Sequence, residues 1–230
     1  MIETLSAYWK FLKRPHLVTR KQDKSHLWRD IAWLLLLDFV VAIIVLSIYA
    51  VLLHSKLIAK HQTFDLFAHG FWWAFIMGAF LAPAIEELIF RWQLKKPKAS
   101  LWFVLLSIGV IGVTATKNDY ARFFIFVALI VISFLLVSYT EKLQRRKTIP
   151  LFRTYYIFLF YYTAIVFGYS HIGNVKGLTL ADPAFIFFTG SQVFGGLTLG
   201  YIRVRYGLRY SILSHTMFNG FMIPLAWLSM

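Results

Sequence analysis

Long apolar runs separated by short polar connections make up almost the whole chain after residue 26. A helix needs about 20 mainly apolar residues to cross a bilayer, and several of these runs reach that length. In lipid the backbone must satisfy its own hydrogen bonds, so such runs are predicted to be helices. The predicted spans are residues 27–53, 66–94, 101–115, 123–139, 155–169, 184–202 and 210–228.

The composition indicates one membrane domain. Hydrophobic residues are 59% of the 230, above the roughly 45–50% of soluble domains. Residues 1–26 are polar and basic and show no small-residue cleavage site, so they are predicted to be a cytoplasmic segment before an uncleaved first span. We therefore expect an all-α, polytopic transmembrane helical bundle over residues 27–230, in a bacterial plasma membrane.

The positive charges predict how the bundle is oriented. The formal net charge is +14, and 19 of the 24 Lys and Arg residues fall in the N-terminal segment and in alternate connections with their adjoining span ends. Such residues concentrate on the cytoplasmic side, which places the N-terminus inside and the C-terminus outside. The charge is thus explained by the lipid bilayer, and no nucleic-acid partner is expected. The absence of cysteine excludes disulfides and a cysteine nucleophile.

An acidic pair lies within the second predicted span. Glu87 and Arg91 are spaced i,i+4 in the favourable order, so they share a helix face. Glu86 points about 100° away from that face and is free to exchange protons in a cavity. Ionisable residues inside spans are candidate functional sites. An alternative is that both acids reach water at the cytoplasmic end of the helix.

Two histidines lie in later spans, each paired with a second residue at i,i+4. Phe167 and His171 end the fifth span, and His215 and Asn219 lie in the seventh. An interfacial role for His171, and helix-to-helix hydrogen bonding by His215 and Asn219, are the simpler interpretations. Asp38, in the first span, is a further acid for which the sequence names no partner.

The three motifs occur in order on three separate spans: Glu86-Glu87-x-x-x-Arg91, Phe167-x-x-x-His171 and His215-x-x-x-Asn219. Together they resemble the CAAX protease and bacteriocin-processing family, also called the Abi family. The resemblance implies a helical intramembrane endopeptidase whose catalytic core comes from spans 66–94, 155–171, 184–202 and 210–228.

The resemblance also implies roles for these residues. Glu86, assisted by His171, would activate a water molecule, while His215 and Asn219 would form an oxyanion hole. Supporting roles fall to Glu87 and Arg91, which hold the acidic helix, and to Phe167, which packs beneath His171.

Two features depart from the family. Trp92 follows the motif arginine where glycine is usual, and 84 positions separate Glu87 from His171, a length consistent with an inserted pair of spans. Depth is a further difficulty, because Glu86 and His215 lie toward cytoplasmic helix ends. His171 lies about 24 Å along a helix that starts at Tyr155, or about 15 Å if the membrane begins at Tyr161.

The sequence leaves more than one assignment for the cofactor and for the partner. Glu86, His171 and His215 are chemically suited to hold zinc, but the sequence lacks HExxH and glutamate-activated water needs no ion, so no obligatory metal is expected. The expected substrate is a membrane-associated peptide or protein. The alternatives are a non-catalytic immunity protein that masks a bacteriocin target, and a proton-coupled transporter. A bacteriocin or its membrane receptor is the corresponding possible partner.

Overall fold

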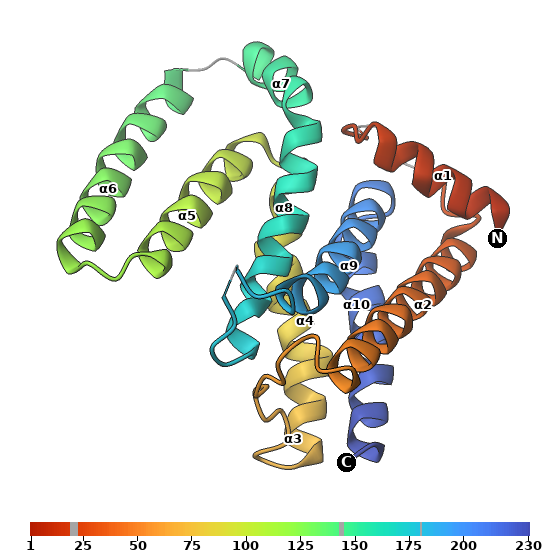
Figure 1. Ribbon diagram of the computed structural model, residues 1–230. Coiled ribbons are helices and arrows are strands. Elements are labelled where there is room, and N and C mark those ends of the chain that lie inside the picture. Colours follow the sequence, from red (N-terminus) through yellow and green to blue (C-terminus); the bar gives the residue numbers. More distant parts are fainter. Residues whose placement is uncertain (19–22, 143–144, 180) are drawn as a thin grey trace.

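The computed structural model describes residues 1–18, 23–142, 145–179 and 181–230, and nearly all of its regular structure is helical (Figure 1). The helices are α1 (Ile2–Lys13), α2 (Leu27–His54), α3 (Phe71–Phe75), η1 (Ile76–Leu81), α4 (Ala82–Arg91), η2 (Trp92–Lys95), α5 (Pro97–Ala115), α6 (Asp119–Lys142), α7 (Arg145–Thr154), α8 (Tyr156–Ser170), η3 (His171–Asn174), α9 (Phe185–Arg205) and α10 (Leu208–Leu228). In these ranges β pairing is limited to one isolated bridge, Thr63 to Val175.

The all-α membrane bundle is confirmed. Five helical stretches are long and apolar enough to cross a membrane: α2, the continuous unit Phe71–Lys95, α5, residues Asp119–Leu136 of α6, and α9. The predicted fifth and seventh spans correspond to α8 and α10, which fall outside these five. The count of seven spans and the cytoplasmic N-terminus therefore stay predictions. Parts of two predicted basic segments, residues 19–22 and 143–144, lie outside the described residues.

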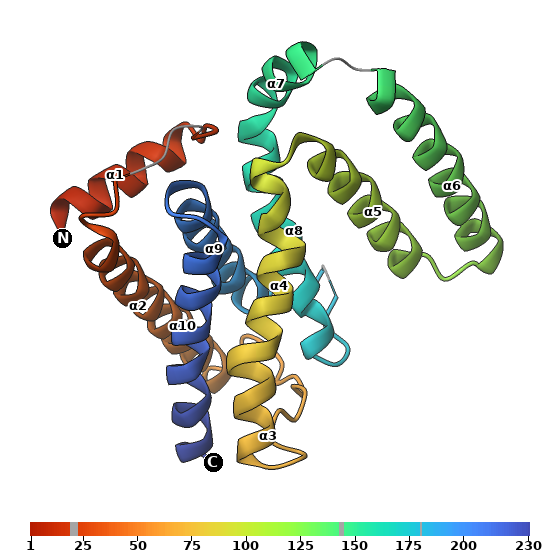
Figure 2. The same cartoon turned by 180° about the vertical axis from the view of Figure 1, so that it is seen from behind.

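Helices α2, α4, α8, α9 and α10 form the main bundle, in which α8 packs most extensively on α9 (Figures 1 and 2). Glycines allow this close approach. A Cβ atom on Gly200 would lie 2.9 Å from Phe160, and one on Gly196 would lie 3.2 Å from the Ala164 Cα. The GxxxG spacing of α9 thus serves helix packing, as small residues commonly do in membranes.

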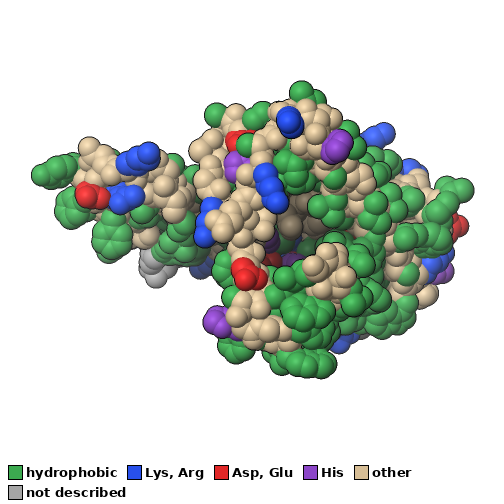
Figure 3. Space-filling view, turned by 60° about the horizontal axis from the view of Figure 1, so that its bottom comes forward, with side chains coloured by type: hydrophobic (Ala, Val, Ile, Leu, Met, Phe, Trp, Pro, Cys, Tyr) green, Lys and Arg blue, Asp and Glu red, His purple; other side chains and the backbone are tan. Residues whose placement is uncertain are grey.

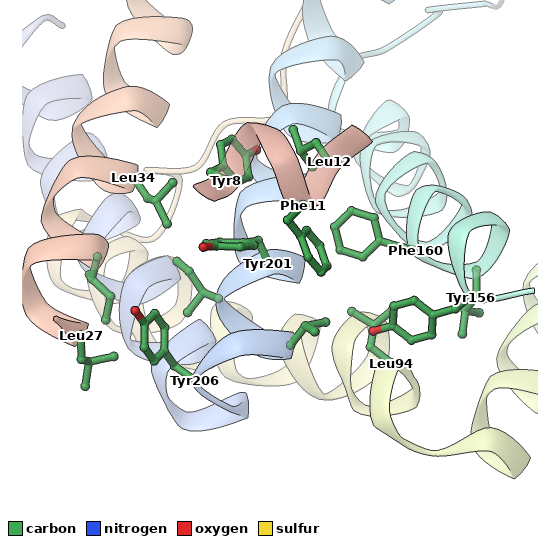
Figure 4. Packing of buried hydrophobic residues seen from close by; sticks show 14 of the residues in the cluster. Tyr8, Phe11, Leu12, Leu27, Leu34, Leu94, Tyr156, Phe160, Tyr201 and Tyr206 are labelled. Carbon is green, nitrogen blue, oxygen red and sulfur yellow. The ribbon is translucent and has the colours of Figure 1, made fainter. Parts of the chain in front are cut away.

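The sequence analysis predicted a polar, basic segment over residues 1–26 and did not predict helix α1 within it. Its buried residues Thr4, Tyr8, Phe11 and Leu12 follow helical spacing. The Phe11 ring packs edge-on against Phe160 and Tyr201 from two other helices (Figure 4). An amphipathic helix therefore closes this end of the bundle.

Asp30 of α2 fastens α1 to the bundle. It accepts hydrogen bonds from the hydroxyls of Thr4 and Tyr206, and the guanidinium of Arg205 lies 3.8 Å away. Burial and the hydrogen bond to Asp30 raise the pKa of Tyr206 to about 12. Three segments distant in sequence thus meet at one carboxylate.

The hairpin of α5 and α6 stands to one side of the bundle (Figures 1 and 2). Its attachment runs through α5, where Phe103 packs edge-on against Phe90 and the Ser107 hydroxyl lies 2.8 Å from that of Tyr162. None of the side chains over Asp119–Leu136 of α6 is buried. Such a peripheral pair fits the inserted spans inferred from the motif spacing.

Candidate active site

A π-helical segment leads into the acidic helix. Pro83, near the start of α4, has no N–H, and a proline ring crowds the carbonyl four residues earlier in an α-helix. The π-helix η1 ends directly before α4 begins. Short π-helical segments are frequently found near functional residues. Within η1, the Gly78 carbonyl accepts a hydrogen bond from Asn219 Nδ2 at 2.8 Å. This bond ties α10 to the π-helix.

Glu87 is fully buried and has three polar neighbours. Its ion pair with Arg91, expected from the i,i+4 spacing, is present with Nε 3.7 Å from Oε2. The Ser211 hydroxyl donates a hydrogen bond to Oε2, and His215 Nδ1 lies 3.2 Å from Oε1. Glu87 therefore also orients the His215 ring, a contact that the sequence did not predict.

Ser211 is a site residue that the sequence analysis missed. It lies on α10 four residues before His215, so both side chains project from the same face toward α4. That i,i+4 spacing is a signal that could have identified it.

Glu86 faces a different environment from its neighbour. Its side chain is 27% exposed, whereas that of Glu87 is 0% exposed. The Glu86 Oε2 atom lies 4.0 Å from His171 Nε2 and 3.8 Å from His215 Nε2. Both separations exceed a direct hydrogen bond. The structure thus brings these three predicted residues together around one small space.

Each imidazole has its other nitrogen engaged. His171 Nδ1 lies 2.8 Å from the Phe167 carbonyl oxygen, and His215 Nδ1 faces Glu87. Both acceptors favour a proton on Nδ1. Nε2 is therefore the atom that each ring presents to Glu86.

The Phe167 ring lies at the centre of these groups. It contacts His171 edge-on with ring centroids 4.8 Å apart, and His215 with centroids 5.9 Å apart. The Arg91 guanidinium carbon lies 4.2 Å from the centroid of the Phe167 ring. The ring thus contacts both histidines and the buried cation.

Helices α8 and α1 meet at Tyr161, the residue from which the shorter of the two depths is counted. The Tyr161 hydroxyl donates a hydrogen bond to the Leu12 carbonyl at the end of α1. Tyr161, six residues after Tyr155, thus lies at the level of α1. The point at which α8 enters the membrane stays a prediction. His171, in η3, then reaches the level of Glu86.

A cavity of about 220 Å³ lies beside His215 and Asn219, between α2, α8, α9 and α10. Asp38 lines it, and the partner that the sequence could not name is Thr198, whose hydroxyl donates to Asp38 Oδ1 at 2.8 Å. Seen from the end of the bundle where the C-terminus lies, the surface is hollowed, with acidic and histidine side chains inside the hollow (Figure 3).

The donor types at Glu86, His171 and His215 are those that zinc prefers. Among the described residues, however, no group of three or more His, Cys, Asp or Glu side chains is arranged to hold a metal ion. Metal binding by these three donors is therefore a question for experiment, and no catalytic step is assigned to an ion.

Comparison with known proteins gives one family. A family model described as type II CAAX prenyl endopeptidase Rce1-like matches residues 68–221. All seven residues of the three motifs fall in this range. No curated protein and no solved structure matches the chain.

Proposed function

This chain belongs to the Rce1-like family of type II CAAX prenyl endopeptidases, and from that premise we propose that it cleaves a membrane-associated peptide or protein using water activated by Glu86. The observation that carries the proposal is the convergence of one carboxylate and two imidazole Nε2 atoms within 4.0 Å. A water molecule bridges polar atoms at such separations.

The proposed reaction begins with proton transfer from water to Glu86, with His171 orienting the water. The hydroxide formed attacks the peptide carbonyl carbon. The resulting oxyanion accepts hydrogen bonds from His215 Nε2–H and from the Asn219 amide. Glu86 then returns the proton to the leaving amine, which breaks the C–N bond.

The neighbouring residues support this chemistry by position. Glu87 accepts from Nδ1 of His215 and so stabilises the doubly protonated ring that donates to the oxyanion. Arg91 compensates the charge of Glu87. Asn219 keeps one N–H for the oxyanion, because its amide has two and Gly78 takes the other.

The proposal is tested by cleavage in proteoliposomes of two probes, a prenylated CAAX peptide and a bacteriocin precursor. We expect Glu86→Gln, His171→Ala and His215→Ala each to lower the rate at least about 100-fold at equal protein level. Asp119→Asn is the matched control, because that carboxylate is exposed and remote from the site, and it leaves the rate unchanged.

A parallel measurement separates catalysis from masking. We propose bacteriocin self-immunity or peptide processing as the biological setting, which follows from the family resemblance. Host cells expressing each variant are challenged with bacteriocins. Loss of protection in Glu86→Gln supports proteolysis, whereas protection that persists without cleavage indicates a non-catalytic immunity protein that binds the bacteriocin or its receptor.

Metal dependence has its own test. Glutamate-activated water needs no ion, so we expect chelation with EDTA to leave the cleavage rate unchanged. Activity that disappears with EDTA and returns with zinc would contradict this, and would assign Glu86, His171 and His215 as ligands.

A further inference from the structure

The cavity beside His215 contains an acid that the proposed reaction does not use. Asp38 projects from α2 into the space that His215 and Asn219 also line. The cavity therefore adjoins the residues assigned to the oxyanion, where the part of a substrate next to the cleaved bond would lie.

The Asp38 carboxylate retains capacity to bind a ligand. Thr198 donates to Oδ1, and among the described residues no ion pair includes Asp38 and no hydrogen bond reaches Oδ2. The Thr198 hydroxyl also lies 3.1 Å from the Tyr8 hydroxyl, which holds it in place. A carboxylate inside an apolar bundle is costly unless a cation or several donors face it.

The remaining walls define the shape of the ligand. Ser191 and Gln192 supply polar groups from α9, and no hydrogen bond within the described part of the chain engages their side chains. Most other lining groups are apolar, including Leu46, Phe194 and Phe218. A water molecule occupies about 30 Å³ of liquid, so a cavity of about 220 Å³ has room for a chain of roughly seven heavy atoms.

We propose that this cavity is a substrate subsite for an aliphatic cation, such as a lysine side chain next to the cleaved bond. The apolar walls contact the alkyl chain, and the Asp38 carboxylate accepts hydrogen bonds from the ammonium group. Asp38 is then a specificity-determining residue. The identification of the cation as part of a substrate rests on the proposed protease function.

The test uses n-hexylamine as the probe and hexan-1-ol as its neutral counterpart. Binding to the detergent-solubilised full chain is measured by saturation-transfer NMR titration. We expect the wild type to bind the amine at least tenfold more tightly than the alcohol, and Asp38→Asn to lose that preference. Asp119→Asn, at an exposed carboxylate that does not line the cavity, should bind the amine as the wild type does.

A second variant guards against misfolding of Asp38→Asn. Gly195 lines the cavity, and a Cβ atom there would meet nothing within 4 Å, so Gly195→Leu should fill the space and abolish amine binding. Gly190→Leu on the same helix is the matched control, because Gly190 does not line the cavity.

Equal binding of amine and alcohol by the wild type would overturn the proposal in favour of an apolar occupant. Unchanged amine preference in Asp38→Asn, or unchanged binding in Gly195→Leu, would overturn it as well. Amine binding by a protein that cleaves neither probe would leave the subsite standing and contradict only the proteolytic function.

Discussion

Glu86 and Glu87 are adjacent in sequence, but their side chains lie in different surroundings. Glu87 is enclosed by Arg91, Ser211 and His215, whereas Glu86 faces the histidine Nε2 atoms. Helical geometry predicted the direction in which each of these two side chains points, since Arg91 lies one turn beyond Glu87 and Glu86 is about 100° away. The contacts of Glu87 with α10 did not follow, because they depend on how two helices pack.

Glu87→Gln should destabilise the protein strongly. It leaves the fully buried Arg91 guanidinium without a counter-charge, and removing one partner of a buried pair costs about 3–5 kcal/mol. The measurement is the thermal unfolding midpoint in detergent. Glu3→Gln is the matched control, because its pair with Arg29 is exposed, and its midpoint should stay near that of the wild type. An equal midpoint for Glu87→Gln would show that the buried pair is not structural.

Ser211→Ala should slow catalysis without weakening substrate binding. The variant removes one hydrogen bond to Glu87, a loss of about 1 kcal/mol, and thereby loosens the orientation of His215. We expect kcat to fall roughly fivefold with KM unchanged. A raised KM at constant kcat would instead place Ser211 in contact with the substrate.

At the scale of elements, close packing of α8 on α9 determines where His171 lies. A Cβ atom on Gly168 would lie 2.4 Å from Val193 Cγ2 and 2.9 Å from the Thr189 carbonyl oxygen. Gly168→Ala must therefore push the helices apart, at a cost of about 1–3 kcal/mol. Because Gly168 lies three residues before His171, activity should fall together with the unfolding midpoint.

Gly190→Ala on α9 is the matched control for that substitution. Its Cβ atom would meet only Ile186, at an ordinary 4.0 Å, so stability should be unchanged or slightly raised. Equal midpoints for the Gly168 and Gly190 variants would show that the helices can move apart freely.

Apolar run length predicted the helical elements well, because a bilayer leaves the backbone few alternatives. It failed for α1, whose apolar stripe is interrupted by basic residues and is too short for a span. It also gave no sign of the π-helix η1, because a local change of helical pitch leaves the run of apolar residues intact. The Pro83 ring is the sequence feature associated with that change.

At the scale of the whole molecule, orientation is the main prediction still to be tested. Helix α1 and the C-terminus lie at opposite ends of the bundle (Figure 1). The chain has no cysteine, so single cysteines can report on each end. In intact cells we expect a membrane-impermeant thiol reagent to label Asp65→Cys and Ser229→Cys but not Ser25→Cys. The reverse pattern would place the N-terminus outside.

Permeabilised cells supply the control for labelling. All three positions are exposed in the folded protein, so each variant should react fully once the membrane is opened. A cysteine that stays unreactive then reports burial rather than sidedness.

The two acids and three basic groups of the site also determine its electrical balance. The proposed reaction uses His215 protonated and His171 neutral, so Glu86 and Glu87 are matched by Arg91 and the His215 imidazolium and the cluster is neutral. Attack by water only moves one negative charge from Glu86 to the oxyanion. Bond cleavage therefore displaces charge over a few ångströms without creating any, and no ion has to cross the lipid to complete a turnover.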